Sequence, residues 1–427
     1  MKKNYILSTV FAFLTLPVWA GDVVINETNF PDANFRNYLR SQRCGNDGIL
    51  TEEELGSVKI ISVADKDITS LKGIEYFTAL ETLWASDNQL TSLDLTKNTQ
   101  LKDLMCNVNQ LSSLDLSKNT KLYFLDCDHN QLSSLVLPET SALENIYCYS
   151  NQLTSLDVSK NTKLELLHCY DNSLTSLDVS KNIKLKFLGC SDNPLASLDV
   201  STNTALIQLV CSTTQLTHLD VSNNTALTEL YCENNQLTSL DVSNNALLTE
   251  LNCSSNQLTF LDVSVATEMR NLLCQDNLLT SLNVSGVTAL TDIRCNNNQL
   301  TSLDVSTNTS LTGLDCYNNY IRGAEMDKLV NGLPINDTYT KNFRVYNSEG
   351  DGNICTKAHV AAAGIRGWTS FYWYKNSWDV YEGSDPSGIN GIVGDWDEDA
   401  PVYNLSGQRL SAPQKGINIV NGRKVMK

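Results

Sequence analysis

The hydrophobic positions of this chain repeat every 21 residues over most of its length. In each repeat, leucines stand two and five residues before a central cysteine and five and eight residues after it, as in Leu164 to Asn182 (LELLHCYDNSLTSLDVSKN). Eleven of the 13 cysteines hold the central position: Cys106, Cys127, Cys148, Cys169, Cys190, Cys211, Cys232, Cys253, Cys274, Cys295 and Cys316. A fixed period of this length predicts a solenoid.

Around each cysteine, apolar and polar residues alternate over a few positions, which predicts one short strand per coil. The leucines and cysteines then point inward, and the residues three and one before the cysteine and one after it point to the opposite, concave face. The pattern begins irregularly at Val58, with Val63 and Ala85 in the cysteine position, and decays after Ile321. We therefore expect a curved parallel β-sheet of about thirteen coils over residues 58–321.

The leucine spacing resembles the leucine-rich repeat, and the inward cysteine makes it most similar to the 21-residue repeats of the internalin J type. The resemblance implies an α/β leucine-rich repeat solenoid with a cap at each end. It also implies that the concave face recognises other molecules. A solenoid exposes its apolar core at its ends, so covering elements are required on physical grounds as well.

The segments on either side of the repeats carry the signals of such caps. Residues 21–57 predict a helical N-terminal cap, with one helix over Phe30–Leu39 and another that starts at Thr51, where Glu54 completes a capping box. Residues 322–382 predict an α/β C-terminal cap. Its expected elements are helices over Ala324–Gly332 and Thr356–Gly364 and strands over Phe343–Tyr346 and Trp368–Tyr374.

The two ends of the chain indicate export. Residues 1–20 predict a signal peptide, with Lys2 and Lys3 before an apolar run from Ile6 to Leu16. An acidic linker over 383–400 leads to a β unit over 401–427. Its Tyr403–Gly407 and Lys415–Val420 motifs and basic end resemble the sorting domain of type IX secretion cargo; an ordinary small β domain is the alternative. We expect a secreted or outer-membrane cell-surface protein without a transmembrane span.

Charge and histidine content limit the classes of function that this chain can have. The net charge of −17 argues against nucleic acid as a partner. Only four residues are histidine, and the chain has no HExxH, GxSxG or glycine-rich phosphate motif. We expect neither enzymatic activity nor a cofactor. The ladder cysteines are expected to be free, buried thiols, because in-register parallel neighbours place their Cβ atoms too far apart for an unstrained bridge.

Three further motifs have a structural and a functional interpretation. Asn46–Glu54 resembles the end of an EF-hand loop, but Arg43 stands where calcium needs a carboxylate. A helix-capped degenerate loop is favoured over a weak calcium site at Asp47 and Glu54. A column of aspartates on the convex side (Asp94, Asp115, Asp157 and successors) is expected to accept hydrogen bonds rather than bind cations. A column of asparagines after the strands (Asn109, Asn130, Asn151, Asn172, Asn193) is expected to bind backbone groups of adjacent coils; Thr214 breaks it.

The concave positions predict one candidate recognition site. Aromatic and apolar residues gather there on neighbouring strands, with a rim of Asp126, Asp128, Asp171 and Asp192; the site comprises Phe124, Asp126, Tyr147, Tyr149, Leu166, His168, Tyr170 and Phe187. Such patches usually mark contacts, although rings along a sheet can also serve stability alone. The resemblance implies adhesion to host or bacterial cells or biofilm through a protein or cell-surface receptor, a glycan or neighbouring bacteria. A structural rod and a glycan-processing enzyme accessory are the alternatives.

Overall fold

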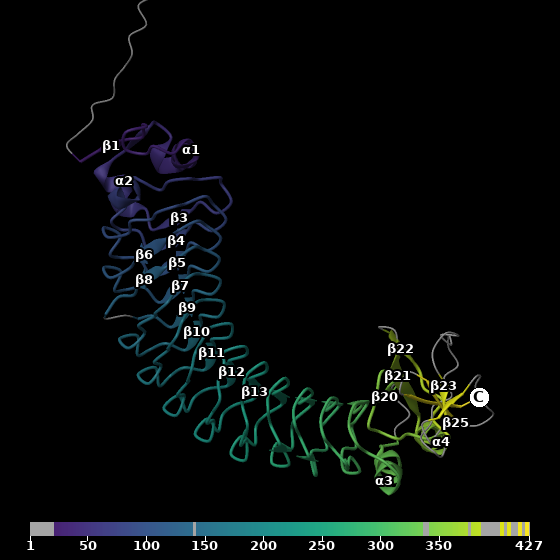
Figure 1. Ribbon diagram of the computed structural model, residues 1–427. Helices are drawn as coiled ribbons and strands as arrows, with labels where there is room; N and C mark the ends of the chain where they lie inside the picture. The colour runs from purple at the N-terminus through teal and green to yellow at the C-terminus, as the bar shows by residue number, and fades with distance from the viewer. Residues whose placement is uncertain are drawn as a thin grey trace, which may run out of the picture. The chain divides into compact units, whose positions relative to one another are not determined.

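The structure is a computed structural model that describes residues 21–139, 142–335, 341–374, 377–385, 402–404, 408–410, 417–420 and 423–426, the last two segments as backbone. It divides into two compact units, Met1–Leu143 and Glu144–Lys427, which are described separately (Figure 1). The predicted signal peptide, most of the acidic linker and the Ser406-Gly407, Lys415-Gly416 and Asn421-Gly422 segments lie outside the described residues.

The first unit begins with the predicted helical cap. Helix α1 (Ala33–Ser41) starts at Asp32, whose carboxylate accepts a hydrogen bond from the Phe35 amide, and it buries Phe35 and Leu39 on one face. Helix α2 (Glu52–Ser57) starts at Thr51 with the predicted capping box. The remaining elements of the cap and of the turn that follows it are β1 (Val23–Val24), η1 (Arg43–Gly45), β2 (Ile49–Leu50) and η2 (Ile74–Tyr76). Strands β1 and β2 pair antiparallel.

The repeats of both units form short parallel strands. The first unit holds β3 (Ile60–Ser62), β4 (Thr82–Trp84), β5 (Asp103–Met105), β6 (Ser113–Asp115), β7 (Phe124–Asp126) and β8 (Ser134–Val136). The second holds β9 (Asn145–Tyr147), β10 (Leu166–His168), β11 (Phe187–Gly189), β12 (Gln208–Val210), β13 (Glu229–Tyr231), β14 (Glu250–Asn252), β15 (Phe260–Asp262), β16 (Asn271–Leu273), β17 (Ser281–Asn283), β18 (Asp292–Arg294) and β19 (Gly313–Asp315).

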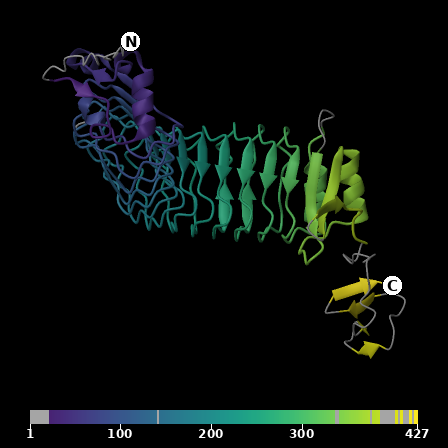
Figure 2. The same ribbon diagram turned by 90° about the horizontal axis from the view of Figure 1, so that it is seen from above.

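The register of these strands follows the sequence period. In the second unit Leu167 lies beside Leu188, and Leu188 beside Leu209, so equivalent residues of successive coils are neighbours. Figure 2 shows the later strands of this unit as a row of separate arrows. Small second sheets form where β6 pairs with β8 and β15 with β17, again in parallel. The predicted leucine-rich repeat solenoid is confirmed.

The core contains the leucines and the cysteine ladder. The ladder cysteines, from Cys106 to Cys316, are all fully buried and unbridged. Burial raises the pKa of the Cys190 and Cys253 thiols to about 12 because a thiolate would lose its hydration there. The thiols therefore pack as small hydrophobic groups.

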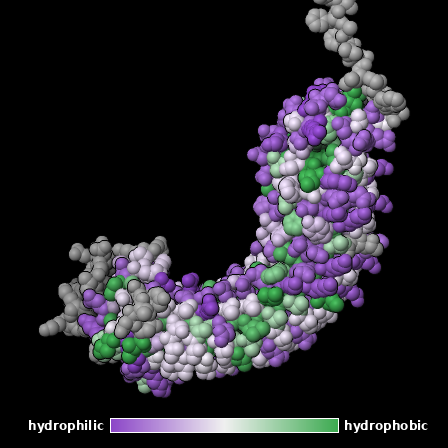
Figure 3. Space-filling view, turned by 180° about the vertical axis from the view of Figure 1, so that it is seen from behind, coloured by the Kyte–Doolittle hydropathy of each residue, from purple (hydrophilic) through white to green (hydrophobic). Residues whose placement is uncertain are grey.

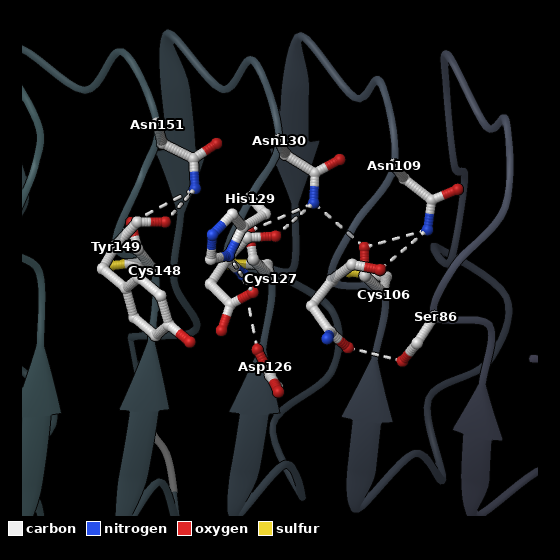
Figure 4. Close-up of polar contacts among 12 residues, drawn as sticks. Ser86, Cys106, Asn109, Asp126, Cys127, His129, Asn130, Cys148, Tyr149 and Asn151 are labelled. Carbon is white, nitrogen blue, oxygen red and sulfur yellow. Dashed lines mark hydrogen bonds and ion pairs between the residues drawn. The ribbon is translucent and has the colours of Figure 1, made fainter.

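The asparagine column joins neighbouring coils, as predicted. In the first unit, Nδ2 of Asn109 donates to the Cys106 carbonyl at 3.1 Å (Figure 4). It also donates to the Ala85 carbonyl of the preceding coil at 2.9 Å, while Oδ1 accepts from the Leu90 amide. In the second unit, Asn193 repeats the pattern toward Cys169 and Cys190. Each side chain thus satisfies backbone groups that no strand pairing reaches.

Two further polar columns support the opposite side of the coils. The convex aspartates accept hydrogen bonds from the serine or threonine amide two residues later, as Asp178 does from Ser180 (2.8 Å), which confirms the structural interpretation. A second asparagine column was not predicted. Its Nδ2 atoms donate to two carbonyls of the preceding coil, as Asn182 does to Val158 and Asn161.

The C-terminal cap continues the sheet of the second unit. Its elements are α3 (Ala324–Gly332), β20 (Lys341–Asn347), α4 (Lys357–Ile365), β21 (Trp368–Tyr374) and β22 (Ser377–Val380). Strand β20 pairs in parallel with β19 and with β21, and β22, which was not predicted, pairs antiparallel with β21. Trp368 is buried, and its Nε1 donates to the Pro334 carbonyl, so this residue helps to close the core.

The last described residues form a separate antiparallel sheet in the order β24-β23-β25-β26. Its strands are β23 (Val402–Tyr403), β24 (Arg409–Leu410), β25 (Ile417–Val420) and β26 (Arg423–Met426). The assignment of this unit as a sorting domain stays a prediction. Within the described residues, no helix has the length and hydrophobicity that crossing a bilayer requires.

Candidate recognition surface

The repeat strands present alternate side chains to the two faces of the sheet. In β10 the central Leu167 is fully buried in the core, whereas Leu166 and His168 on either side are half-buried on the other face. The same alternation holds in β9, where Asn145 and Tyr147 flank the buried Ile146. The predicted orientation of the site residues is therefore confirmed on these strands.

Four predicted residues in the second unit meet as an aromatic cluster, defined here as Tyr147, Tyr149, His168 and Tyr170. The rings of Tyr149 and Tyr170 stack with their centroids 4.3 Å apart and an interplanar angle of 14°. Tyr147 meets His168 edge-on at 5.3 Å, and His168 lies 6.1 Å from Tyr170. Offset and edge-to-face contacts of this kind hold rings in fixed positions.

The neighbouring strand shapes this cluster. Leu166 and Phe187 are paired across β10 and β11, and both side chains are half-buried, which extends the apolar surface beside the rings. At the other end of β11, a Cβ atom on Gly189 would stand 3.2 Å from Cδ2 of His168. Glycine at this position therefore leaves room for the imidazole.

The environment of His168 suits binding more than proton transfer. Burial lowers the pKa of its imidazole, which favours the neutral ring. Its ring neighbours are the hydroxyphenyl groups of Tyr147 and Tyr170. A neutral imidazole among tyrosines offers a flat, weakly polar contact surface that a partner can cover.

Two predicted site residues, Phe124 and Asp126, belong to the first unit. Both are half-buried at the two ends of β7. Asp128 was predicted as part of an exposed rim, and this was wrong: it is 4% exposed and its Oδ1 lies 3.0 Å from Nδ1 of His129. Burial and the nearby Asp128 carboxylate raise the pKa of Asp126 to about 7.

The remaining rim residues lie in the second unit as expected. Asp171 and Asp192 are exposed, each one residue before a ladder asparagine, with φ of 53° and 52°. This left-handed conformation is one that aspartate and asparagine tolerate better than most residues. The two carboxylates therefore border the strand ends that carry the cluster.

The two carboxylates of the alternative calcium site, Asp47 and Glu54, accept hydrogen bonds from nearby residues of the chain. Oε2 of Glu54 accepts hydrogen bonds from the amide and the hydroxyl of Thr51, both at 2.9 Å. Oδ1 of Asp47 accepts from the Ile49 amide at 3.0 Å. These contacts support the helix-capped loop. In the part of the chain that is described, no group of three or more histidine, cysteine or acidic side chains is arranged to hold a metal ion.

Figure 3 shows hydrophilic residues spread over the visible face of the coils, with hydrophobic residues interspersed among them.

Sequence reasoning missed one functional candidate, Trp378, on the C-terminal cap. Trp378 lies on the unpredicted strand β22, and its ring lies 5.2 Å from that of Trp373. A second aromatic run immediately after Trp368–Tyr374 was the available signal.

Comparison with known proteins places these features in a family. A scan against protein-family models gives no match, and neither does a search of curated proteins. Among solved structures, the functional domain of InlJ from Listeria monocytogenes, described as including a cysteine ladder, is 30% identical. The match covers 78% of this chain and 83% of that one, with a TM-score of 0.53.

Two other solved structures agree. The internalin InlF from Listeria monocytogenes is 25% identical over 73% of this chain and 94% of its own, with a TM-score of 0.62. A leucine-rich repeat protein from Leptospira interrogans is 26% identical over 61% of this chain and 72% of its own, with a TM-score of 0.56. An internalin-like fold indicates protein–protein recognition. With its 21-residue period, buried thiol ladder and this level of identity, the chain belongs to the internalin-like leucine-rich repeat proteins with a cysteine ladder.

Proposed function

We propose that this protein is exported and binds a partner protein non-covalently, without enzymatic activity, through the concave face of its solenoid. The aromatic cluster, with Leu166 and Phe187 beside it, forms the contact. The observation that supports this proposal is the set of packed rings, because the repeat fold does not require aromatic residues at these positions. Strands β13 and β14 place Glu229, Tyr231, Glu250 and Asn252 there, in the same parallel register.

The physical argument for contact rests on pre-organisation. Stacked and edge-on rings lose little side-chain freedom when a partner covers them, and tyrosine contributes strongly to binding energy in such centres. Exposed Asp171 and Asp192 supply a charged border, as in interfaces with an apolar centre and a polar rim. For the first unit by itself, Phe124 and Asp126 are proposed as contact residues.

The biological setting that we propose is adhesion, to host cells, to bacterial cells or within a biofilm. The signal-like residues 1–20 and the sorting-like motifs at the C-terminus support a secreted or outer-membrane surface protein, for which type IX secretion is the proposed route. The resemblance to internalins supports a receptor on a cell surface as the partner. A rigid structural rod is the competing function.

The test compares the wild-type chain with a Tyr147→Ser, Tyr149→Ser, Tyr170→Ser triple variant. Binding is measured to intact bacterial cells, epithelial cells and immobilised matrix proteins, after both proteins show the same unfolding midpoint. A matched control changes Tyr123 and Tyr320 to Ser, since these tyrosines are exposed and lie outside the concave positions.

We expect the wild type and the control to bind one class of target and the triple variant to bind at least about tenfold more weakly, as loss of a tyrosine hot spot implies. Equal binding by all three proteins would contradict the assignment of the cluster as the contact. Absence of binding by the wild type to every target would instead favour the structural rod.

A further inference from the structure

A polar hollow of about 580 Å³ lies at the C-terminal end of the sheet in the second unit. Its walls come from the last repeat strands and from β20, β21 and β22 of the cap, which stand side by side in Figure 2. The volume falls within the range of small-molecule sites. This C-terminal hollow is separate from the aromatic cluster, and none of its lining residues belongs to the predicted site.

One wall of the hollow is a rigid aromatic group. The ring of Trp378 meets Trp373 at 5.2 Å and 65°, and Tyr317 at 5.2 Å and 66°. The guanidinium carbon of Arg344 lies 5.1 Å from the centre of the Trp378 ring. All three rings are half-buried, so they retain surface that faces the hollow. Mutual edge-on packing fixes this surface before any ligand arrives.

The fixed charges of the hollow cancel. Two carboxylates, Asp276 and Asp315, and two guanidinium groups, Arg294 and Arg344, line it. Arg344 donates to both oxygens of Asp315, at 3.1 Å and 3.0 Å. Arg294 donates to Asp292 at 3.2 Å. A lining with as many carboxylates as guanidinium groups gives little net attraction to an anion or a cation, which favours an uncharged polar ligand.

Two side-chain oxygens of the lining residues are covered by protein atoms and lack a hydrogen-bond partner in the described part of the chain. Oε1 of Gln275 and Oδ1 of Asn318 are buried and have no partner among the described residues. The amide group of Asn318 is held in place, because its Nδ2 donates to Asn297, and Asn297 donates to Asp276, both at 2.6 Å. A buried acceptor without a partner costs free energy, which a hydroxyl donor would recover.

We propose that the C-terminal hollow binds an uncharged saccharide unit. The apolar face of a pyranose ring packs against Trp378 and Tyr317, and one of its hydroxyl groups donates to Oε1 of Gln275 once that side chain turns toward the hollow. Vicinal hydroxyls, which both donate and accept, suit a lining of amides, carboxylates and guanidinium groups. This site is additional to the protein contact proposed above and does not depend on it.

The test uses the full chain and its tryptophan fluorescence. The probes are the methyl glycosides of glucose, galactose, mannose and N-acetylglucosamine, with sialic acid as the charged comparison. Two variants report on the hollow: Trp378→Phe, which reduces the ring surface, and Gln275→Leu, which removes one acceptor. The matched controls are Trp84→Phe on strand β4 and Gln257→Leu, an exposed glutamine of a repeat. Unfolding midpoints establish that each variant is folded.

We expect at least one neutral glycoside to bind the wild type and both controls, and to bind each hollow variant about tenfold more weakly, the scale of one lost ring contact or hydrogen bond. The triple variant of the aromatic cluster should bind the glycoside as the wild type does. The glycoside site can therefore be tested independently of the protein contact at the aromatic cluster.

Three results would overturn the proposal. One is that no neutral glycoside binds, either in solution or on an array of oligosaccharides. Another is that binding survives unchanged in both hollow variants. The third is a preference for sialic acid, or for unglycosylated peptides on the same array, that Trp378→Phe abolishes, since the hollow would then belong to a charged or a protein ligand.

Discussion

Asp126 and the convex aspartates of the repeats have pKa shifts in opposite directions. Hydrogen bonds from Ser180 lower the pKa of Asp178, and equivalent serines do the same for its neighbours. Burial and the Asp128 charge instead raise the pKa of Asp126 to about 7. Because the native state then holds a proton that the unfolded chain releases above about pH 4, ionisation of Asp126 opposes folding.

This difference predicts how Asp126→Asn changes stability with pH. The folded pKa exceeds the unfolded one, so the unfolding free energy of the wild type falls as the pH rises from about 4 to about 7. The variant keeps an acceptor oxygen without the charge. It should be more stable than the wild type at pH 8, by on the order of 1 kcal/mol once solvent screening of this half-exposed group is allowed for, and equal to it at pH 4.

Urea titrations of both proteins at pH 4, 6 and 8 measure the effect. Asp171→Asn, which changes an exposed aspartate in the second unit, is the matched control. A constant difference between Asp126→Asn and the wild type at all three pH values would contradict the prediction.

At this scale, the sequence predicts side-chain direction only where the backbone is extended. The period of two placed Tyr147 and His168 on the correct face, and their ring contact follows from their 21-residue spacing. Asp128 lies two residues beyond the end of β7, in the turn where His129 adopts φ of 46°. There the alternation no longer holds, so its burial could not be read from the pattern.

Among the elements, the coil that contains Thr214 shows what the asparagine column contributes. In a regular coil Leu174 N donates to Oδ1 of Asn193 at 2.9 Å. The equivalent Leu195 N instead bonds to the Asn193 carbonyl, because the Thr214 hydroxyl donates to Cys211 and does not reach the preceding coil. Gln215, next in the chain, adopts φ of 66°. The irregular backbone therefore occurs where Thr214 replaces an asparagine and Pro194, which has no amide hydrogen, precedes Leu195.

Thr214→Asn should restore the missing bridge. An amide at this position can donate to the Cys190 carbonyl and accept from Leu195 N, and we expect the unfolding free energy to rise by about 1 kcal/mol, the usual net value of a buried hydrogen bond. The reverse change in the adjacent coil, Asn193→Thr, should destabilise by at least as much. Thermal unfolding of both variants tests this, and a lower midpoint for Thr214→Asn would show that the altered backbone is the preferred one.

Some elements of the caps follow from local sequence signals, and others depend on pairing between distant segments. Helices α2 and α4 begin at capping residues, Thr51 and Thr356, and α3 matches its predicted range, because capping and apolar spacing are local signals. Strand β22 depends on antiparallel pairing with β21, a contact that no short-range pattern in Ser377–Val380 announces. The C-terminal hollow could not be predicted for the same reason, since one of its walls needs that strand.

For the whole molecule, the free state of the cysteines is the property most open to measurement. All 13 cysteines are unbridged, and Cys44 is half-buried whereas the others are buried. We expect native protein at pH 8 to react with a thiol reagent at Cys44 at most, and to expose 13 thiols in denaturant. Its unfolding midpoint should be the same with and without reductant. A drop in midpoint on reduction would reveal a disulfide and contradict the packed-thiol core.

The constant register of the coils also fixes the spacing between sites on different strands in whole repeats. Successive strands of the second unit are offset by whole repeats, and apart from the coil of Thr214 the coils are joined through the same asparagine bridge. Gain or loss of one 21-residue segment between β11 and β16 would leave matching strands in contact on both sides of the change. It would move the aromatic cluster and the C-terminal hollow apart or together by one strand spacing, about 4.8 Å. Spacing between two binding sites could thus evolve in fixed increments, by recombination between repeats, with neither site redesigned.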